Sequence, residues 1–309
     1  MTLKALSLWN SHEGTERFIR VSSNFVFSFK SGEDSFILRL TPGEDRLRLQ
    51  AEMDFLLLLS NQGLTVNMPV PSVNGNLIEP IVTDAGNFQA VVFNFFEGEQ
   101  LEIDEMTGER MEAWGRALGS LHAVSNGISW LTDHTRLESL LGGNGDNLPM
   151  AVRREESYLR NWLYGLQQTQ ESYGPIHFDL ELDNIIWQGS KPQIIDFESS
   201  LTGWYAADIA FALRDLFEDV VDLQDEKFSL FLQGYRQARP IGDQEVKDIP
   251  MFLRYRQLLT YKLLLNSMDV KVNPEQPEWV NELIIKLENK RAQYEAGFEV
   301  ENEMEQRSQ

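Results

Sequence analysis

The sequence contains no cysteine, only four histidines and no long hydrophobic run among its 309 residues. The absence of cysteine excludes disulfide bonds, thiolate nucleophiles and thiolate-bound metals, and four scattered histidines do not favour a zinc site. The chain shows neither a signal-like opening nor an apolar segment that approaches the length of a membrane span. We therefore expect a soluble, cytoplasmic protein that makes no membrane contact.

Basic residues are also scarce, since 27 lysines and arginines stand against 48 aspartates and glutamates, for a formal net charge of −21. Such a charge repels the phosphates of nucleic acid, and no basic stripe overrides it, so we expect no nucleic-acid partner. A chain of this length with 42% hydrophobic residues can bury a substantial core, which fits two lobes of unequal size better than a single one. The sequence leaves the oligomeric state open.

What the sequence does contain is a dense polar motif between residues 176 and 197, which reads IHFDLELDNIIWQGSKPQIIDF. His177, Asp179 and Asn184 fit the pattern H-x-D-x-x-x-x-N of kinase-type phosphoryl transfer. In that pattern the aspartate faces the attacking hydroxyl as the catalytic base, and the asparagine offers its amide oxygen to a metal ion. The motif therefore predicts Asp179 as the base and Asn184 as a metal ligand.

Two short apolar segments follow Asn184, at residues 185–187 and 193–195, and a turn that contains glycine and proline joins them. A hairpin of this kind folds Asp196 back beside Asn184. Magnesium is usually held by one or two such side-chain oxygens, with water and phosphate oxygens in the other positions. The motif therefore predicts a site for magnesium and ATP. An isolated H-x-D pair is more often structural than catalytic, so the kinase-like interpretation depends on the joint pattern.

The motif, H-x-D-x-x-x-x-N followed by I-D-F-E, resembles the catalytic core of the aminoglycoside phosphotransferase and choline kinase superfamily. Within it, the chain is most similar to the bacterial branch that contains homoserine kinase type II and the stress-response kinases. The resemblance covers nearly the whole chain. It implies an α+β, protein-kinase-like fold: a small N-lobe over residues 1–97, with an antiparallel sheet plus a helix, and a larger, mainly helical C-lobe over residues 98–309.

The first half of the expected N-lobe reads as strands at residues 16–29 and 34–40, with a turn at 30–33. By the resemblance, Ser23 and Asn24 occupy the loop that covers the nucleotide phosphates in kinases. This loop has no glycine, so it is stiffer than usual, although its backbone N–H groups could still reach phosphate. Considered alone, the segment would be an ordinary hairpin.

Arg39 stands in the third strand where kinases usually carry lysine, and Glu52 resembles the partner that holds it. The planar guanidinium group of arginine can bridge a phosphate and a carboxylate, so the replacement is chemically tolerable. The alternative is a surface pair without function.

Residues 88–96 form an apolar run that ends at a glycine, which is typical of a buried strand followed by a turn. In the family that it resembles, this segment is the hinge between the lobes, where the main chain binds adenine. The resemblance makes the carbonyl of Asn94 and the N–H of Phe96 the candidate contacts. A core strand without this role is the alternative, and both interpretations can hold together.

Three further residues have supporting roles in this interpretation. The helix expected at residues 111–122 ends in His122, which we expect to be a packed structural histidine. His177 is expected to orient the catalytic loop. By the resemblance, Asp208 braces that loop.

The acceptor side is less defined. Acidic residues between 215 and 226 recur at helical spacing, which indicates either a solvated helix face or a site for a cationic, amine-bearing substrate. We expect loops at 142–147 and 271–278, a core helix at 251–268, and a frayed end after Ala296.

The predicted function is ATP- and magnesium-dependent transfer of the γ-phosphoryl group to a hydroxyl of a small, amine-bearing molecule such as homoserine, another amino alcohol or an aminoglycoside. One alternative is a protein serine/threonine kinase of the stress-response type. The other is a catalytically weak, kinase-like binding protein, which the glycine-free loop and Arg39 would suit. The intact set of Asp179, Asn184 and Asp196 favours an enzyme.

Overall fold

The structure is a computed structural model that describes residues 2–84, 86–126, 135–142, 148–217, 220–268 and 278–308. Most of the two predicted loops, at 143–147 and 271–277, lies outside the described residues.

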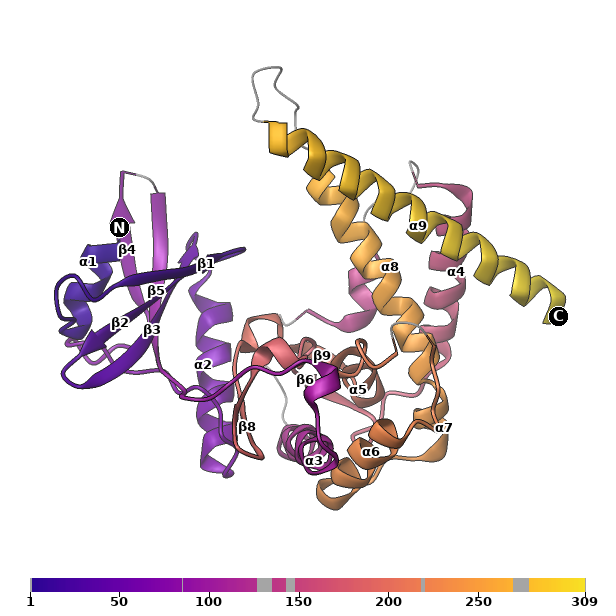
Figure 1. The fold of residues 1–309 in the computed structure, drawn as a ribbon, viewed down its shortest axis with the longest axis horizontal. Helices are drawn as coiled ribbons and strands as arrows, with labels where there is room; N and C mark the ends of the chain where they lie inside the picture. The colour runs from indigo at the N-terminus through magenta and orange to yellow at the C-terminus, as the bar shows by residue number, and fades with distance from the viewer. Residues whose placement is uncertain are drawn as a thin grey trace.

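The N-terminal part is a five-stranded antiparallel sheet with the strand order β1-β2-β3-β5-β4, which lies at the left of Figure 1. Its strands are β1 (Arg17–Val21), β2 (Phe25–Ser31), β3 (Asp34–Pro42), β4 (Glu79–Thr83) and β5 (Gly86–Asn94). The strands predicted from residues 16–40 and 88–96 are therefore confirmed.

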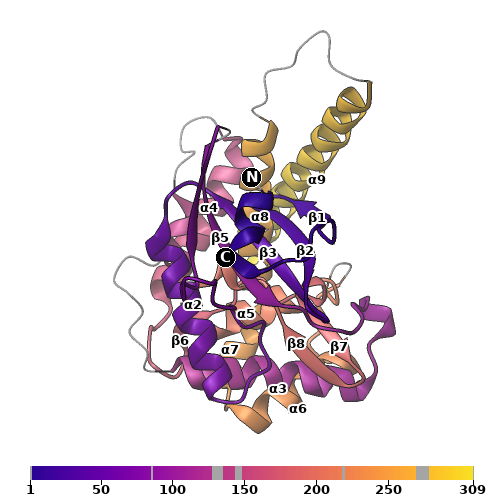
Figure 2. The same cartoon turned by 90° about the vertical axis from the view of Figure 1, so that its left-hand side faces the viewer.

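The alternation of side chains in β3 explains how the sheet is covered on both faces. Leu38 and Leu40 are buried in a cluster with α1 (Thr2–Leu6) and the short helix η1 (Ser7–Trp9), and α1 lies in front of the strands in Figure 2. Because neighbouring side chains in a strand point to opposite faces, Arg39 lies on the other face. That face packs against α2 (Arg46–Asn61), the helix that carries Glu52.

The C-terminal part is mainly helical (Figure 1). Its α-helices are α3 (Gly108–Ser125), α4 (Met150–Gly165), α5 (Tyr205–Ala212), α6 (Glu226–Ala238), α7 (Asp243–Lys247), α8 (Ile249–Met268) and α9 (Glu278–Ser308). Short 3-10 helices are η2 (Ile103–Glu105), η3 (Leu137–Leu141), η4 (Leu182–Asn184) and η5 (Phe197–Ser199). The helices predicted at 111–122 and 251–268 are confirmed within α3 and α8.

Two small antiparallel sheets lie among these helices. One pairs β6 (Tyr173–Ile176) with β9 (Leu201–Trp204), and the other is the hairpin of β7 (Ile185–Gln188) and β8 (Lys191–Ile194). The hairpin confirms the prediction made from the two apolar segments after Asn184. Antiparallel N-terminal strands and C-terminal helices together confirm the predicted α+β class.

The hydrophobic core consists of a small cluster within the sheet and a large one that crosses from α2 to the C-terminal helices. At the crossing, the ring of Phe55 meets the ring of Phe197 edge to face, with 5.8 Å between their centroids. The two parts are therefore packed together at α2 and η5. We propose the lobe boundary at residue 97, immediately after β5, where the main chain passes from the sheet to the helices.

One predicted element is wrong. The acidic residues between 215 and 226 do not form a helix, because α5 ends at Ala212, α6 begins at Glu226, and the described residues between them form turns or irregular structure. Two of the aspartates use their side chains on the local backbone: Asp222 accepts the N–H of Gln224 at 2.8 Å, and Asp225 caps α6 by accepting the N–H of Phe228 at 3.0 Å. Aspartate favours such turns and caps over helix interiors. Glu218 and Asp219 lie outside the described residues.

The expected frayed end is also wrong, since α9 continues from Glu278 to Ser308. The ring of Phe298 is buried against Tyr261 of α8, with 5.6 Å between the ring centroids, so α9 packs on α8 beyond Ala296. None of the helices in the described ranges combines the length and apolar character needed to cross a bilayer.

Candidate active site

The loop that carries Asp179 follows β6 and is shaped by a buried carboxylate. Asp208, in α5, accepts the backbone N–H of His177 at 2.9 Å and that of Phe178 at 2.7 Å. Phe178 has a φ of 72°, in the left-handed region that side chains other than glycine rarely occupy. Such conformations persist where the surroundings enforce them, often at functional sites. Asp208 thus lies where the sequence predicted a brace for this loop.

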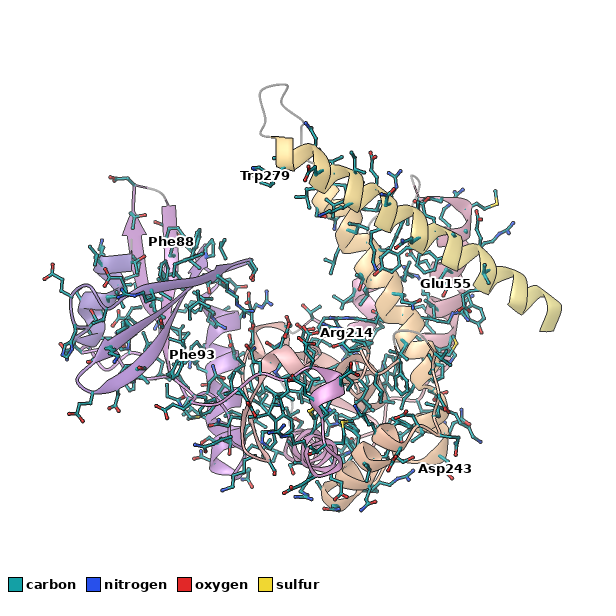
Figure 3. All side chains as sticks on the ribbon, viewed as in Figure 1. Phe88, Phe93, Glu155, Arg214, Asp243 and Trp279 are labelled. Carbon is teal, nitrogen blue, oxygen red and sulfur yellow. The ribbon has the colours of Figure 1, made fainter. Side chains whose placement is uncertain are left out.

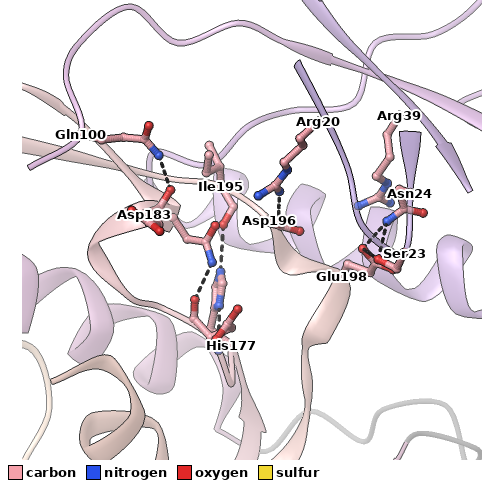
Figure 4. Close-up of polar contacts among 12 residues, drawn as sticks. Arg20, Ser23, Asn24, Arg39, Gln100, His177, Asp183, Ile195, Asp196 and Glu198 are labelled. Atoms are coloured by element: carbon pink, nitrogen blue, oxygen red, sulfur yellow. Dashed lines mark hydrogen bonds and ion pairs between the residues drawn. The ribbon is translucent and has the colours of Figure 1, made fainter. Parts of the chain in front are cut away.

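His177 joins the loop to the segment that carries Asp196. Its Nε2 donates to the carbonyl of Ile195 at 3.0 Å, and its Nδ1 accepts the N–H of Asp179 at 3.4 Å (Figure 4). The ring is buried and packs on Phe197, with 4.5 Å between the ring centroids. With both nitrogens occupied, His177 is placed to position the loop rather than to react.

His122 belongs to the same buried network. Its ring nitrogens contact the Asp208 carboxylate at 2.9 Å and the Tyr235 hydroxyl at 2.8 Å. Burial lowers the pKa of His122 below its ordinary value, although Asp208 opposes this effect. These contacts agree with the packed structural histidine expected from the sequence.

Two arginines that the sequence interpretation did not assign to the site hold the Asp179 carboxylate. Arg214 and Arg256 donate to its Oδ1 at 3.1 and 2.7 Å, and Arg214 also pairs with Glu181. The second oxygen, Oδ2, has no hydrogen-bond partner among the described residues. Sequence order gave little indication of this contact, because Arg256 lies 77 positions after Asp179.

The candidate metal ligands lie side by side, as the hairpin predicted. The N–H of Ile195 donates to the main-chain carbonyl of Asn184 at 3.0 Å, so Asp196 follows directly beside Asn184. The Asn184 amide nitrogen donates to the carbonyl of Asp179 at 2.8 Å. Its amide oxygen accepts no hydrogen bond from the described residues. An oriented, unused amide oxygen next to a carboxylate fits a hard divalent cation.

Asp196 has a φ of 65° and pairs through Oδ2 with Nη2 of Arg20, in β1, at 2.5 Å (Figure 4). The described residues contain no group of three or more His, Asp or Glu side chains arranged to hold a metal. The described part of the chain therefore supplies few ligands, which is the usual case for magnesium bound together with nucleotide phosphates.

Arg39 and Glu52 form a buried pair, which corrects the alternative of a surface pair. Their guanidinium and carboxylate groups make two parallel hydrogen bonds of 2.9 and 2.6 Å, and the side chains are only 6% and 7% exposed. Burial opposes the charged form, but Glu52 outweighs it, so the pKa of Arg39 is raised. The guanidinium also lies over the ring of Phe93, 5.1 Å from its centroid.

The loop between β1 and β2 contacts the segment after Asp196. Ser23 donates to the Glu198 carboxylate at 3.2 Å, and the Asn24 amide donates to the same group (Figure 4). Arg48, in α2, donates to the main-chain carbonyl of Glu198 at 2.8 Å. Glu198 was missed as a site residue, although the I-D-F-E motif contains it. Glu198 thus connects the loop between β1 and β2 to the segment that carries Asp196.

A cavity of about 440 Å³ lies between the sheet and the hairpin, with both Arg39 and Asp196 in its wall. The other lining residues are mainly apolar and include Val26, Ile37, Phe93, Ile186 and Ile195. Asn94 and Phe96, the predicted adenine contacts, also line it. An apolar slot whose wall also contains charged groups suits a flat base with a phosphate chain.

Gly98 makes the passage between the lobes possible. Its φ is 151°, and a Cβ there would overlap the main-chain carbonyl of Trp187. The adjacent Glu99 exchanges two backbone hydrogen bonds with Trp187, of 3.0 and 2.7 Å. The segment after β5 is thereby hydrogen-bonded to β7.

A second cavity, of about 900 Å³, opens on the other side of the catalytic loop between α8, α9 and the turn after α5. Its wall contains Phe178, Arg214 and Arg256, the direct neighbours of Asp179. Of the described acidic residues between 215 and 226, only Asp215 lines it. The expected acidic face is therefore reduced to a single carboxylate.

The profile described as phosphotransferase enzyme family matches residues 16–241. Among curated proteins, the chain is 24% identical over 279 residues to the amicoumacin kinase of Bacillus subtilis (strain 168), covering 84% of this chain and 82% of that protein. It is 29% identical over 260 residues to the homoserine kinase of Mesorhizobium japonicum, covering 78% of this chain and 75% of that protein.

Solved structures confirm the kinase-like fold. An amicoumacin kinase in complex with AMP-PNP and Ca²⁺ aligns with a TM-score of 0.79 at 24% identity, over 96% of this chain and 93% of that one. A microcompartment-associated aminopropanol kinase aligns with a TM-score of 0.74 at 22% identity, over 96% and 95%. The family match over residues 16–241 includes the sheet, the hinge and the motif from His177 to Asp208, and the chain therefore belongs to the phosphotransferase enzyme family.

Proposed function

We propose that this phosphotransferase moves the γ-phosphoryl group of ATP to a hydroxyl of a small, amine-bearing molecule. One observation supports the proposal most strongly: Asp179, Asn184 and Asp196 are held together between two cavities. The cavity beside Asp196 suits a nucleotide, and the cavity beside Asp179 suits an acceptor.

On the nucleotide side, the main chain at Asn94 and Phe96 binds the base within the apolar slot. Arg39, fixed by Glu52, contacts the phosphates, as its two-pronged geometry allows. Ser23 and Asn24 close the loop over the phosphate chain.

Asn184 and Asp196 hold a divalent cation, for which magnesium is our proposal. When bound, such a cation neutralises charge that develops on the phosphate oxygens. The structural relative in complex with AMP-PNP and Ca²⁺ supports the use of a nucleotide and a divalent cation.

On the acceptor side, Oδ2 of Asp179 orients the hydroxyl and takes up its proton late in the reaction. Such general-base assistance contributes roughly 10²–10⁴ in rate, and positioning and electrostatics supply the remainder. Arg214 and Arg256 hold Oδ1, which leaves Oδ2 facing the acceptor. His177 and Asp208 keep the loop in its left-handed turn.

The acceptor cavity, at about 900 Å³, has the size of a small-molecule site and so favours a small acceptor over a protein. The names of the relatives and structural neighbours include homoserine and aminopropanol, both of which carry an amine and a hydroxyl. Asp215 is the residue in the wall that can pair with an amine.

The test is transfer of label from γ-labelled ATP to a panel of small amino alcohols. We predict that Asp179→Asn removes transfer, because the base is lost, while nucleotide affinity stays within about twofold of wild type, since Asp179 lies outside the nucleotide cavity. Asp243→Asn, at a side chain 92% exposed in α7, is the matched control and should transfer normally. Normal transfer by Asp179→Asn would contradict the assignment of the base.

A further inference from the structure

The acceptor cavity has a charge pattern unlike that of the chain as a whole. Although the formal net charge is −21, the described residues of its lining include one carboxylate, Asp215, and four cationic side chains, namely Arg214, Arg256, Lys262 and Lys290. A site for a purely cationic amine would be expected to show the opposite pattern.

Two of these cations are already neutralised by the protein. Arg214 pairs with Glu181 and with Asp179, which is 3.1 Å away. Lys262 lies 2.8 Å from the Glu156 carboxylate and donates to the carbonyl of Leu141 at 2.7 Å. These contacts give Arg214 and Lys262 a structural use within the cavity wall.

Arg256 differs from them. Its one hydrogen bond to the described residues goes to Oδ1 of Asp179, at 2.7 Å, and Arg214 shares that oxygen. An arginine has five N–H donors, so most of them are left for a ligand. The guanidinium is fixed over the rings of Phe178 and Phe211, at 4.8 and 5.4 Å from their centroids. Burial lowers the pKa of Arg256, although Asp179 opposes this effect, and an added anion would favour the charged form.

Lys290 approaches the same cavity from α9. Its ammonium lies 5.4 Å from the centroid of the Tyr294 ring, and no carboxylate of the described residues lies within ion-pair distance of it. The lysine one turn earlier, Lys286, is exposed and is not part of the lining. Lys290 thus adds a positive charge to the cavity that no carboxylate in the described part of the chain neutralises.

We propose that the acceptor carries a carboxylate as well as its hydroxyl and amine, and that Arg256 and Lys290 bind this carboxylate. This inference rests on the proposed function. The planar fork of Arg256 suits a carboxylate, and its contact with Asp179 places that group next to the reacting hydroxyl. Asp215, whose Oδ1 lies 3.8 Å from Nε of Arg214, is the described carboxylate in the lining that would contact the amine. The cavity would therefore select a hydroxy amino acid over a simple amino alcohol.

The test compares homoserine with 3-aminopropan-1-ol, which has the same hydroxyl and the same amine but lacks the carboxylate. The wild-type enzyme should show a kcat/KM at least about tenfold higher for homoserine, because a charge-assisted contact of this kind typically contributes that much or more. Equal or better use of 3-aminopropan-1-ol would overturn the inference while leaving the proposed function intact.

Substitutions then locate the subsite. Lys290→Gln and Arg256→Gln should each reduce the homoserine preference several-fold, whereas Lys286→Gln, one turn away on α9, should leave it unchanged. Arg256→Gln also loosens Asp179 and so lowers kcat for both acceptors; the ratio between acceptors isolates its effect on the carboxylate. An unchanged ratio in both variants would contradict the assignment.

Direct binding measurements separate a failure of the proposed function from a failure of the carboxylate subsite. If wild type transfers phosphate to neither compound, the proposed acceptor class is wrong, and calorimetric titration of both compounds with AMP-PNP and Mg²⁺ present tests the carboxylate subsite alone. Tighter binding of homoserine that Lys290→Gln weakens would support the subsite. Equal or absent binding of both compounds would overturn it.

Discussion

At the scale of single residues, Arg39 is the main departure from the usual kinase pattern. The structure gives it a fully formed partner, because both oxygens of Glu52 accept from its guanidinium and both side chains are buried. Buried pairs do not necessarily add stability over apolar residues, but removal of one partner leaves an uncompensated charge. A comparison of variants that lack one partner with a variant that lacks both can therefore separate a structural role of Arg39 from a catalytic one.

We predict that Arg39→Met lowers the free energy of unfolding by about 3–5 kcal/mol, because Glu52 is left buried and unpaired. The double variant Arg39→Met with Glu52→Leu should regain most of this stability and still bind ATP poorly. Urea unfolding and the KM for ATP measure the two effects separately. If the double variant regained normal ATP use, the pair would have only a structural role.

His122 makes stability depend on pH. Because its pKa is lowered in the folded protein, the unfolded chain takes up a proton first as pH falls. The contribution of neutral His122 to the free energy of unfolding is therefore complete above the unfolded-state pKa of about 6.5 and is lost as pH falls below it.

We predict that wild type loses stability between pH 7 and pH 5 more steeply than His122→Gln. The difference in slope should not exceed about 1.4 kcal/mol per pH unit, the value for one proton. Urea midpoints at several pH values give both curves. Parallel curves would show that His122 does not titrate in this range.

The motif was predictable from the sequence at this scale, because spacing alone brings His177, Asp179 and Asn184 together on one loop. The sequence interpretation missed Arg20, Arg214 and Arg256, which reach the same site from β1, the turn after α5, and α8. Local spacing contains no information about contacts between elements so distant in sequence.

At the scale of elements, α3 and α6 form a close helix pair that depends on glycine. A Cβ on Gly115 would overlap the main-chain carbonyl of Phe231, and one on Gly234 would overlap that of Glu112. The helices therefore approach each other where side chains are absent, and α3 carries His122 towards Asp208. The packing of α3 on α6 thus supports the loop that carries Asp179 through His122 and Asp208.

We predict that Gly115→Ala destabilises the protein by at least about 1–3 kcal/mol, because the helices must move apart. Gly297→Ala is the matched control: Gly297 lies within α9 with no atom near a built Cβ, and this change should stabilise by up to about 1 kcal/mol. Thermal and urea unfolding measure both. Wild-type stability in Gly115→Ala would contradict the close approach of α3 and α6.

The acidic segment shows where element prediction failed. Its carboxylates recur at helical spacing, yet Asp222 and Asp225 bind local backbone N–H groups and end the helical pattern. Spacing does not distinguish a helix face from a series of turns and caps, because both place polar residues toward solvent. The hairpin of β7 and β8 was predictable because two short apolar segments joined by a turn with glycine and proline have fewer alternatives.

At the scale of the whole molecule, the two parts of the chain meet at the nucleotide cavity. The sheet supplies Arg39, the hinge supplies Asn94 and Phe96, and the C-terminal part supplies Asp196. Arg20 of β1 pairs with Asp196, so the contact between the parts reaches the candidate metal ligand itself. The net charge of −21 opposes the binding of a nucleotide, so we expect binding to depend on a divalent cation and on the arginines.

The most direct test of the central claim is therefore the affinity for ATP with and without magnesium. In wild type and in the exposed control Asp243→Ala, magnesium should tighten ATP binding substantially. In Asp196→Ala we predict that this gain disappears, so that the affinity is the same with and without the metal. Wild-type, magnesium-dependent affinity in Asp196→Ala would contradict the assignment of the site.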